Sequence, residues 1–177
     1  MRRLLADQLY KRMEKNPKIF LICCDLGYKV FDEHFRAFPE RCINTGAAEQ
    51  AAMGIAVGLA LEGKIPFIYS ITNFVLYRPF ETVRNYLDHE QIPVKILAAG
   101  RDKDYAHDGY SHQSEDAKKI LDTLPNIVQF WPEDKQEIPD ILKETMRNNL
   151  PTFISLRRIW VCQKLYKWLQ NKQKIVQ

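Results

Sequence analysis

Long apolar segments, metal-spaced cysteines and phosphate-binding glycine patterns are all missing from this 177-residue sequence. The uncharged part of its alanine-rich segment, Gln50–Leu61, is shorter than the roughly 18 residues that a membrane span requires. No glycine spacing matches a P-loop or a dinucleotide-binding turn. The cysteines lack metal-ligand spacing, which favours reduced, buried thiols; they are Cys23, Cys24, Cys42 and Cys162. The sequence therefore indicates neither a membrane span nor a site of these kinds.

Acidic residues are absent from the C-terminal end. From Arg157 onward there are six basic residues and no acid, whereas the rest of the chain has 20 basic and 22 acidic residues. The net charge of +4 therefore comes from this end, and the body lacks the basic face typical of nucleic-acid binding. We expect a domain over 1–158 and a basic helical tail over 159–177. The tail either packs on its own domain, docks on a partner or touches an anionic surface.

Composition and length are typical of one globular domain with an appendage. Apolar residues make up 46% of the chain and charged residues 27%. The first residues begin like a signal peptide, but Asp7, Gln8, Lys11 and Arg12 interrupt any apolar region. We therefore expect a cytoplasmic protein.

Short apolar runs alternate with helical patterns along the chain. The runs predict strands over 18–24, 41–44, 65–70, 94–98, 127–130 and 152–156. Helices are expected over 1–15, 30–38, 48–62, 74–89, 114–124 (with Ser114 as N-cap) and 133–148, and a long loop over 100–113. This alternation predicts an α/β fold: an open, mostly parallel sheet of about six strands with helices on both faces.

Three polar segments follow predicted strands. Glu49 stands in the first turn of the helix after Gly46, where it either serves a ligand or only complements the helix dipole. The loop with His107, Asp108 and His112 forms either a polar site or a solvated surface, and its spacing matches no standard zinc pattern. The aromatics of Ile71–Phe80 either stack on a flat ring or pack in the core, and its Arg78 suits an anion. All three lie at the ligand edge of a parallel sheet.

Taken in order, these segments resemble the pyrimidine-binding domain of the transketolase family. The similar stretches are Asp25-Leu26-Gly27, 38–50 around Glu49, 69–85 around Phe74, Asp108-Gly109-Tyr110-Ser111-His112-Gln113, Pro125-Asn126-Ile127 and Pro132-Glu133-Asp134. The resemblance runs from near the N-terminus to about Arg158. It implies the fold of the thiamine-diphosphate-binding pyrimidine domain.

The resemblance also implies roles by position. Glu49 would hydrogen-bond the aminopyrimidine of thiamine diphosphate and so activate the cofactor, with His112 as a second catalytic residue. Phe74 would stack on the same ring, with Ile71 at a position where an aromatic is common and Asp25 near the cofactor across a subunit boundary. The candidate substrate-binding residues are Asp108, His112, Arg78 and His107, and Arg2 or Arg3 would meet a substrate phosphate. No metal ligand is assigned to this chain.

The departures from the family pattern imply a partner. Nothing here resembles the glycine-aspartate-glycine segment and asparagine with which the family's other domain holds Mg2+ and diphosphate, and Tyr110 replaces a usual proline. The chain therefore resembles the small subunit of a split transketolase. We expect a hetero-oligomer, built on a pyrimidine-domain dimer, with a separate diphosphate-binding subunit that holds Mg2+ and shares thiamine diphosphate. The expected substrates are sugar phosphates.

Two other functions stay open. One keeps the cofactor but changes the reaction, as in a deoxyxylulose phosphate synthase or the beta subunit of a 2-oxoacid dehydrogenase. The other is a non-catalytic pyrimidine-domain scaffold. The histidine-bearing loop favours a sugar substrate over a 2-oxoacid.

Overall fold

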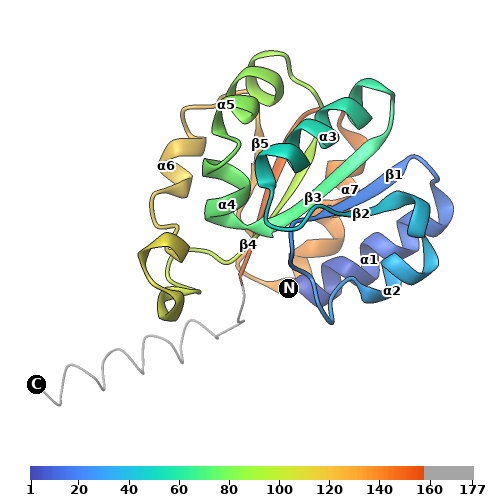
Figure 1. The fold of residues 1–177 in the computed structure, drawn as a ribbon, viewed down its shortest axis with the longest axis horizontal. Helices are drawn as coiled ribbons and strands as arrows, with labels where there is room; N and C mark the ends of the chain where they lie inside the picture. Colours follow the sequence, from blue (N-terminus) through green and yellow to red (C-terminus); the bar gives the residue numbers. More distant parts are fainter. Residues whose placement is uncertain (158–177) are drawn as a thin grey trace, which may run out of the picture.

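The computed structural model describes residues 1–157, and its centre is a six-stranded sheet (Figure 1). The strands are β1 (Ile19–Cys23), β2 (Cys42–Asn44), β3 (Ile65–Ile71), β4 (Lys95–Ala99), β5 (Val128–Phe130) and β6 (Thr152–Leu156). All pair in parallel in the order β2-β1-β3-β4-β6-β5. The predicted open parallel sheet is confirmed. The expected helix of the tail lies outside the described residues.

Helices cover both faces of this sheet (Figure 1). On one side lie α1 (Arg2–Lys15), α2 (Asp32–Ala37) and α7 (Ile138–Arg147). On the other lie α3 (Glu49–Leu61), α4 (Thr72–Tyr77), α5 (Phe80–Thr82), the π-helix η2 (Val83–His89) and α6 (Ala117–Leu121). Within residues 1–157, no helix is both long enough and apolar enough to cross a membrane.

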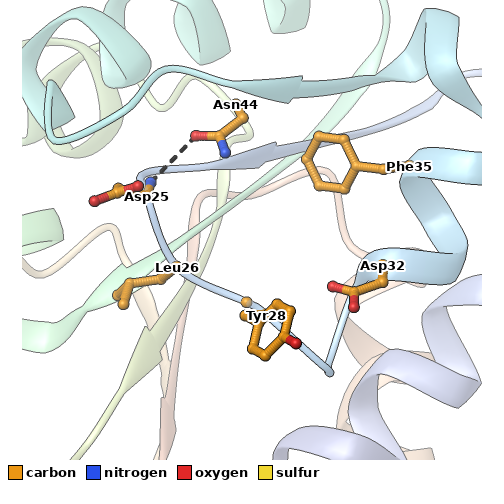
Figure 2. Close-up of a pocket in the computed structure, with 7 residues that line it drawn as sticks. Asp25, Leu26, Tyr28, Asp32, Phe35 and Asn44 are labelled. Atoms are coloured by element: carbon orange, nitrogen blue, oxygen red, sulfur yellow. Dashed lines mark hydrogen bonds between the residues drawn. The ribbon is translucent and has the colours of Figure 1, made fainter.

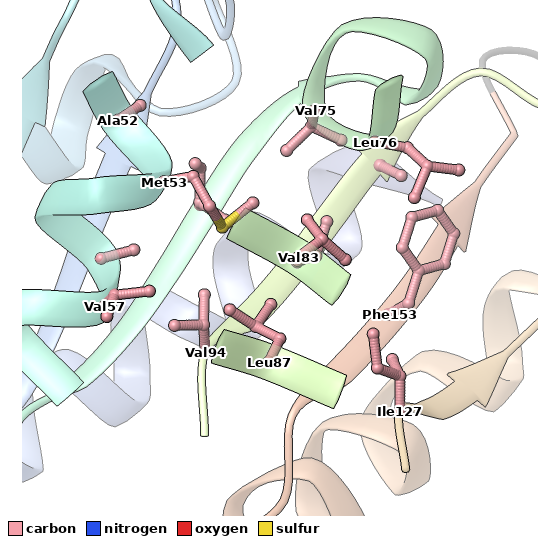
Figure 3. Close-up of a cluster of buried hydrophobic side chains, with 14 of the residues drawn as sticks. Ala52, Met53, Val57, Val75, Leu76, Val83, Leu87, Val94, Ile127 and Phe153 are labelled. Carbon is pink, nitrogen blue, oxygen red and sulfur yellow. The ribbon is translucent and has the colours of Figure 1, made fainter. Parts of the chain in front are cut away.

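Alternation along β1 explains the two layers of core. Ile19, Leu21 and Cys23 join the cluster under α1 and α7, whereas Ile22 and Cys24 join the cluster under α3. Successive side chains of a strand point to opposite faces, so an apolar run of this kind is buried on both sides. Figure 3 shows the second cluster, where Met53 of α3 lies near side chains of α4 and η2.

Three helix predictions need correction. The segment expected as one helix over 74–89 starts at Thr72 and breaks at Pro79, whose ring and missing N–H disfavour an uninterrupted helix. Ser114 does not cap a helix: its N–H donates to the carbonyl of Asp102 at 2.8 Å, and α6 begins only at Ala117.

The helix expected over 133–148 instead opens with the 3-10 turn η5 (Lys135–Glu137). Asp134 caps this turn, because its side chain accepts from the Gln136 N–H and the Glu137 side chain accepts from the Asp134 N–H. The long loop over 100–113 contains two more 3-10 turns, η3 (Ala106–Asp108) and η4 (Tyr110–His112). Such short turns are not predictable from hydrophobic periodicity, because they contain too few residues to show a repeating pattern of apolar positions.

The strand order turns between β1 and β3. The chain moves from β1 outward to β2, and then returns past β1 to add β3 and β4 on the other side. Beyond β4 lie β6 and, at the edge of the sheet, β5. Ligands of open α/β sheets bind outside the carboxyl ends of the strands at such a switch point. Residues that follow β1, β2, β3 and β4 therefore meet at the edge where a site is expected.

Candidate active site at the carboxyl edge of the sheet

Glu49 is a buried carboxylate at the start of α3. Gly46, with a φ of 64°, turns the chain after β2, and Glu49 is the first helical residue, only 2% exposed. The Ser70 hydroxyl donates to Oε1 of Glu49 at 3.0 Å. The Nη1 atom of Arg78 donates to Oε2 at 2.6 Å. Both carboxylate oxygens therefore have a donor, as a buried charge requires.

Arg78 links Glu49 to an aromatic pair. Its side chain is 45% exposed, whereas that of Glu49 is 1% exposed. The guanidinium carbon lies 3.9 Å from the centre of the Phe74 ring, a cation–π distance. Phe74 meets the His112 ring edge-on, with 4.9 Å between the ring centres. The structure thus brings four of the sequence-predicted site residues into one chain of contacts, Glu49–Arg78–Phe74–His112.

The loop that carries the histidines is anchored to α4. The side-chain amide of Asn73 donates to the carbonyls of Ser111, at 3.0 Å, and Gln113, at 2.6 Å. The Thr72 hydroxyl donates to the carbonyls at the end of β4, Ala99 and Gly100. Because α4 starts directly after β3, these bonds fix the loop after β4 to the end of its neighbouring strand.

Within this loop, Tyr105 organises the histidines. Its ring centre lies 6.3 Å from that of His107 and 6.4 Å from that of His112, and the ring itself is packed against Gly100. The Nε2 atom of His107 lies 3.2 Å from Oδ2 of Asp108. The candidate substrate-binding residues of the loop therefore adjoin the Phe74–His112 pair.

Arg101 holds the base of the same loop. It is 5% exposed and donates to the Ser155 hydroxyl at 3.0 Å, to Glu133 at 2.7 Å and to the Pro132 carbonyl at 2.9 Å. These bonds join the end of β4 to β6 and to the turn after β5. Arg101 is a buried structural cation that positions the loop.

Asp25 lies outside this chain of contacts and lines a pocket of about 400 Å3 at the ends of β1 and β2. Figure 2 shows Leu26 and Tyr28 on the loop after β1, and Asp32 and Phe35 from α2 and its start. The Asn44 side chain accepts from the N–H of Asp25 at 3.3 Å. This contact holds the end of β2 against the loop after β1.

Three further predicted residues, Ile71, Arg2 and Arg3, lie in different parts of the structure. Ile71, 7% exposed, ends β3 opposite Ala99 of β4. Arg2 is half-buried and donates to the Tyr105 hydroxyl at 3.4 Å, which brings the start of α1 to the histidine loop. Arg3 lines a separate groove between α1 and α2.

The thiols near the site are not activated. Burial, together with the neighbouring charge of Glu49, raises the pKa of Cys24 to about 11, and burial raises that of Cys42 to about 11. Such thiols are protonated near neutral pH and are poor nucleophiles. Among residues 1–157 no cluster of three or more histidine, cysteine or acidic side chains is arranged to hold a metal ion.

Sequence reasoning missed three residues of this region. Ser70 had a usable signal, because it stands two positions from Ile68 on a strand and must share the face that α3 covers. Asn73 and Arg101 had none, since the partners described above lie 31 to 54 residues away in sequence. Only the tertiary fold brings those groups together.

The fold and the site define a parallel α/β domain with a buried carboxylate that Arg78 links to an aromatic ring at its ligand edge. A family model of the transketolase pyrimidine-binding domain matches residues 1–163. A putative transketolase C-terminal section of Methanocaldococcus jannaschii is 30% identical over 159 residues, which cover 89% of this chain and 50% of that protein. A 6-deoxy-6-sulfo-D-fructose transketolase subunit of Clostridium sp. (strain MSTE9) is 26% identical, over 89% of this chain and 49% of that protein.

Solved structures agree. One described as a split gene transketolase, inactive beta4 tetramer, is 34% identical with a TM-score of 0.79 and covers 91% of this chain and 52% of its own. A transketolase from Leishmania mexicana shares the fold, with 23% identity and a TM-score of 0.78 over 89% of this chain and 25% of its own. The chain belongs to the transketolase pyrimidine-binding-domain family, which confirms the resemblance drawn from its motifs. It spans about half the length of the two curated relatives named.

Proposed function

We propose that this chain is the small subunit of a heteromeric, thiamine-diphosphate-dependent transketolase that moves a two-carbon ketol unit between sugar phosphates. One observation carries the proposal. The carboxylate of Glu49 is buried at the first turn of α3 and binds Arg78, whose guanidinium lies over the Phe74 ring. A buried acid beside an aromatic face suits a flat ring that bears nitrogen atoms.

The residues present fit the aminopyrimidine half of thiamine diphosphate. Phe74 offers a ring face, and Glu49 offers Oε2, whose present partner, Arg78, is half-exposed. When bound, this cofactor supplies the nucleophilic carbon for ketol transfer. Ser70 holds Oε1, so Oε2 is the atom of Glu49 that would carry a proton toward a ring nitrogen.

The histidine loop is proposed to receive the sugar. His112 lies against Phe74, and His107 with Asp108 continues the polar surface away from it. Imidazole and carboxylate groups hydrogen-bond sugar hydroxyls. We propose that Arg2, which reaches Tyr105 of the same loop, meets a substrate phosphate, and that Asp25 serves a site completed by another subunit.

The proposal includes a separate subunit that binds diphosphate and Mg2+. Two features support it: one relative is described as a putative transketolase C-terminal section, and one similar solved structure is described as a split gene transketolase. We propose a hetero-oligomer built on paired copies of this domain, in the cytoplasm.

The test starts with an affinity pull-down of the tagged chain from its own cells, with mass spectrometry of the proteins that co-purify. The complex is then assayed with ketose and aldose phosphates, and separately with pyruvate and an aldose phosphate. We expect a stoichiometric diphosphate-binding partner, ketol transfer that depends on thiamine diphosphate, and its loss in Glu49→Gln. Turnover only in the assay with pyruvate and an aldose phosphate would identify a deoxyxylulose phosphate synthase-type reaction. Normal turnover of Glu49→Gln would sink the proposed role of this residue.

A further inference from the structure

Arg78 contacts both groups that would recognise the cofactor ring. Its guanidinium lies over the face of Phe74, and its Nη1 atom binds Oε2 of Glu49. A guanidinium is planar and carries N–H donors along its edge. In shape, and in its stacking on Phe74, it therefore resembles the amino-substituted ring that the site is proposed to hold.

We infer that Arg78 is a placeholder: without cofactor its guanidinium occupies the aminopyrimidine position between Phe74 and Glu49, and it must leave when the ring enters. The inference rests on the proposed function. It adds that the chain competes internally with its own cofactor.

The hydrogen bonds at Glu49 support the inference that Arg78 must leave before the ring can bind. Arginine can only donate, and the Ser70 hydroxyl donates to the other oxygen, so Glu49 accepts at both Oε1 and Oε2. A ring nitrogen with a lone pair needs a donor instead. Glu49 can therefore bind such a nitrogen only after Oε2 has lost Arg78 and gained a proton.

The side chains of Glu49 and Arg78 differ in how freely they can move. Glu49 is fixed in the first turn of α3 with its side chain 1% exposed, whereas the side chain of Arg78 is 45% exposed at the break between α4 and α5. Arg78 can reach water by rotating its side chain, and its charge is then solvated. The apparent affinity for the ring equals the intrinsic affinity multiplied by the fraction of molecules in which Arg78 has left.

The experiment titrates the full chain with the aminopyrimidine fragment of thiamine, carrying a methyl group in place of the thiazolium arm. Binding is followed by NMR in the wild type, Arg78→Met, Arg78→Lys and Glu49→Ala. Arg84→Met is the matched control, because Arg84 is exposed and its side chain contacts the adjacent Asn85. We expect Arg78→Met to bind the probe on the order of tenfold more tightly than the wild type. Arg78→Lys should fall between them, and Arg84→Met should equal the wild type.

A second readout follows Arg78 itself. Its side-chain protons are shielded by the Phe74 ring, so in the wild type their resonances should move downfield as the probe binds. Unchanged resonances at saturation would overturn the inference.

The outcomes separate the two proposals. If Glu49→Ala abolishes binding but Arg78→Met binds no more tightly than the wild type, the placeholder is wrong and the proposed function stands. If the probe binds to none of these proteins, the proposed function falls and the placeholder with it. If Arg78→Met does not fold, Arg78→Lys decides: tighter binding supports the inference and unchanged binding refutes it.

Discussion

Gly100 is the residue whose replacement should damage the candidate site most selectively. It follows β4 with a φ of 81°, a conformation that L-residues rarely adopt, and a methyl group there would overlap ring carbons Cδ2 and Cε2 of Tyr105. Tyr105 is 8% exposed, and its ring centre lies 6.3 Å from that of His107 and 6.4 Å from that of His112. Gly100→Ala therefore strains the backbone and displaces the ring that organises the histidine loop.

The magnitude has two parts. The left-handed backbone costs roughly 1–2 kcal/mol for a residue with a Cβ. Overpacking against a buried side chain adds roughly 1–3 kcal/mol. We therefore expect Gly100→Ala to lower the free energy of unfolding by about 2–5 kcal/mol. Gly63 is the matched control, because its φ is 70° and no neighbouring atom lies within 4 Å of the position that an alanine Cβ would take.

The assay is urea unfolding of the full chain, followed by circular dichroism, in a double-mutant cycle. Tyr105→Leu removes the overlapping ring, so Gly100→Ala should cost roughly 1–3 kcal/mol less in that background than in the wild type. Gly63→Ala should show only the backbone cost. Equal losses for Gly100→Ala and Gly63→Ala, or simple additivity with Tyr105→Leu, would refute the reasoning.

Three other predictions concern Lys95, Asn73 and Arg78. Burial lowers the pKa of Lys95 to about 8, so between about pH 8 and 10.5 the unfolded chain binds more protons than the folded chain. The free energy of unfolding should therefore rise with pH across that window by up to about 3 kcal/mol relative to Lys95→Met. Urea unfolding at several pH values measures this difference. Asn73→Ala removes the donor to the Ser111 and Gln113 carbonyls and should cost roughly 1–3 kcal/mol, with faster hydrogen exchange at the His112 and Gln113 amides and unchanged exchange in α1. Arg78→Met should destabilise the cofactor-free chain by about 1–3 kcal/mol in thermal unfolding, while Arg84→Met has little effect; equal stability of the two variants would show that Glu49 does not need its partner.

Much of the fold could be predicted from sequence because each strand is a short apolar run between helical patterns. β1 shows why: alternate residues serve two different clusters, so nearly every position is apolar. The details near Pro79 could not be predicted in the same way. An apolar period continues through the break, and only the packed structure shows that α4, α5 and η2 are separate segments.

In the candidate site, too, features with a local sequence signal could be predicted, and features that depend on tertiary contacts could not. Glu49 could be located because a glycine turn and a helix start are local signals. Its pairing with Arg78 could not, since the two residues are 29 positions apart and meet only because α4 packs beside α3. The loop with His107 and His112 was recognisable by composition, but its attachment through Asn73 depends on tertiary contacts.

The proposed role of Glu49 creates a conflict that the position of Arg78 resolves. A carboxylate buried for chemistry on a ring needs a charged or hydrogen-bonding partner whenever the ring is absent, because an unpaired buried charge is costly. Ser70 satisfies one oxygen of Glu49 and leaves the other. A mobile, half-exposed cation that also stacks on Phe74 satisfies that second oxygen, covers the aromatic face and can still withdraw into water. The same contact therefore stabilises the folded chain and, under the proposed function, sets the free energy that cofactor binding must overcome.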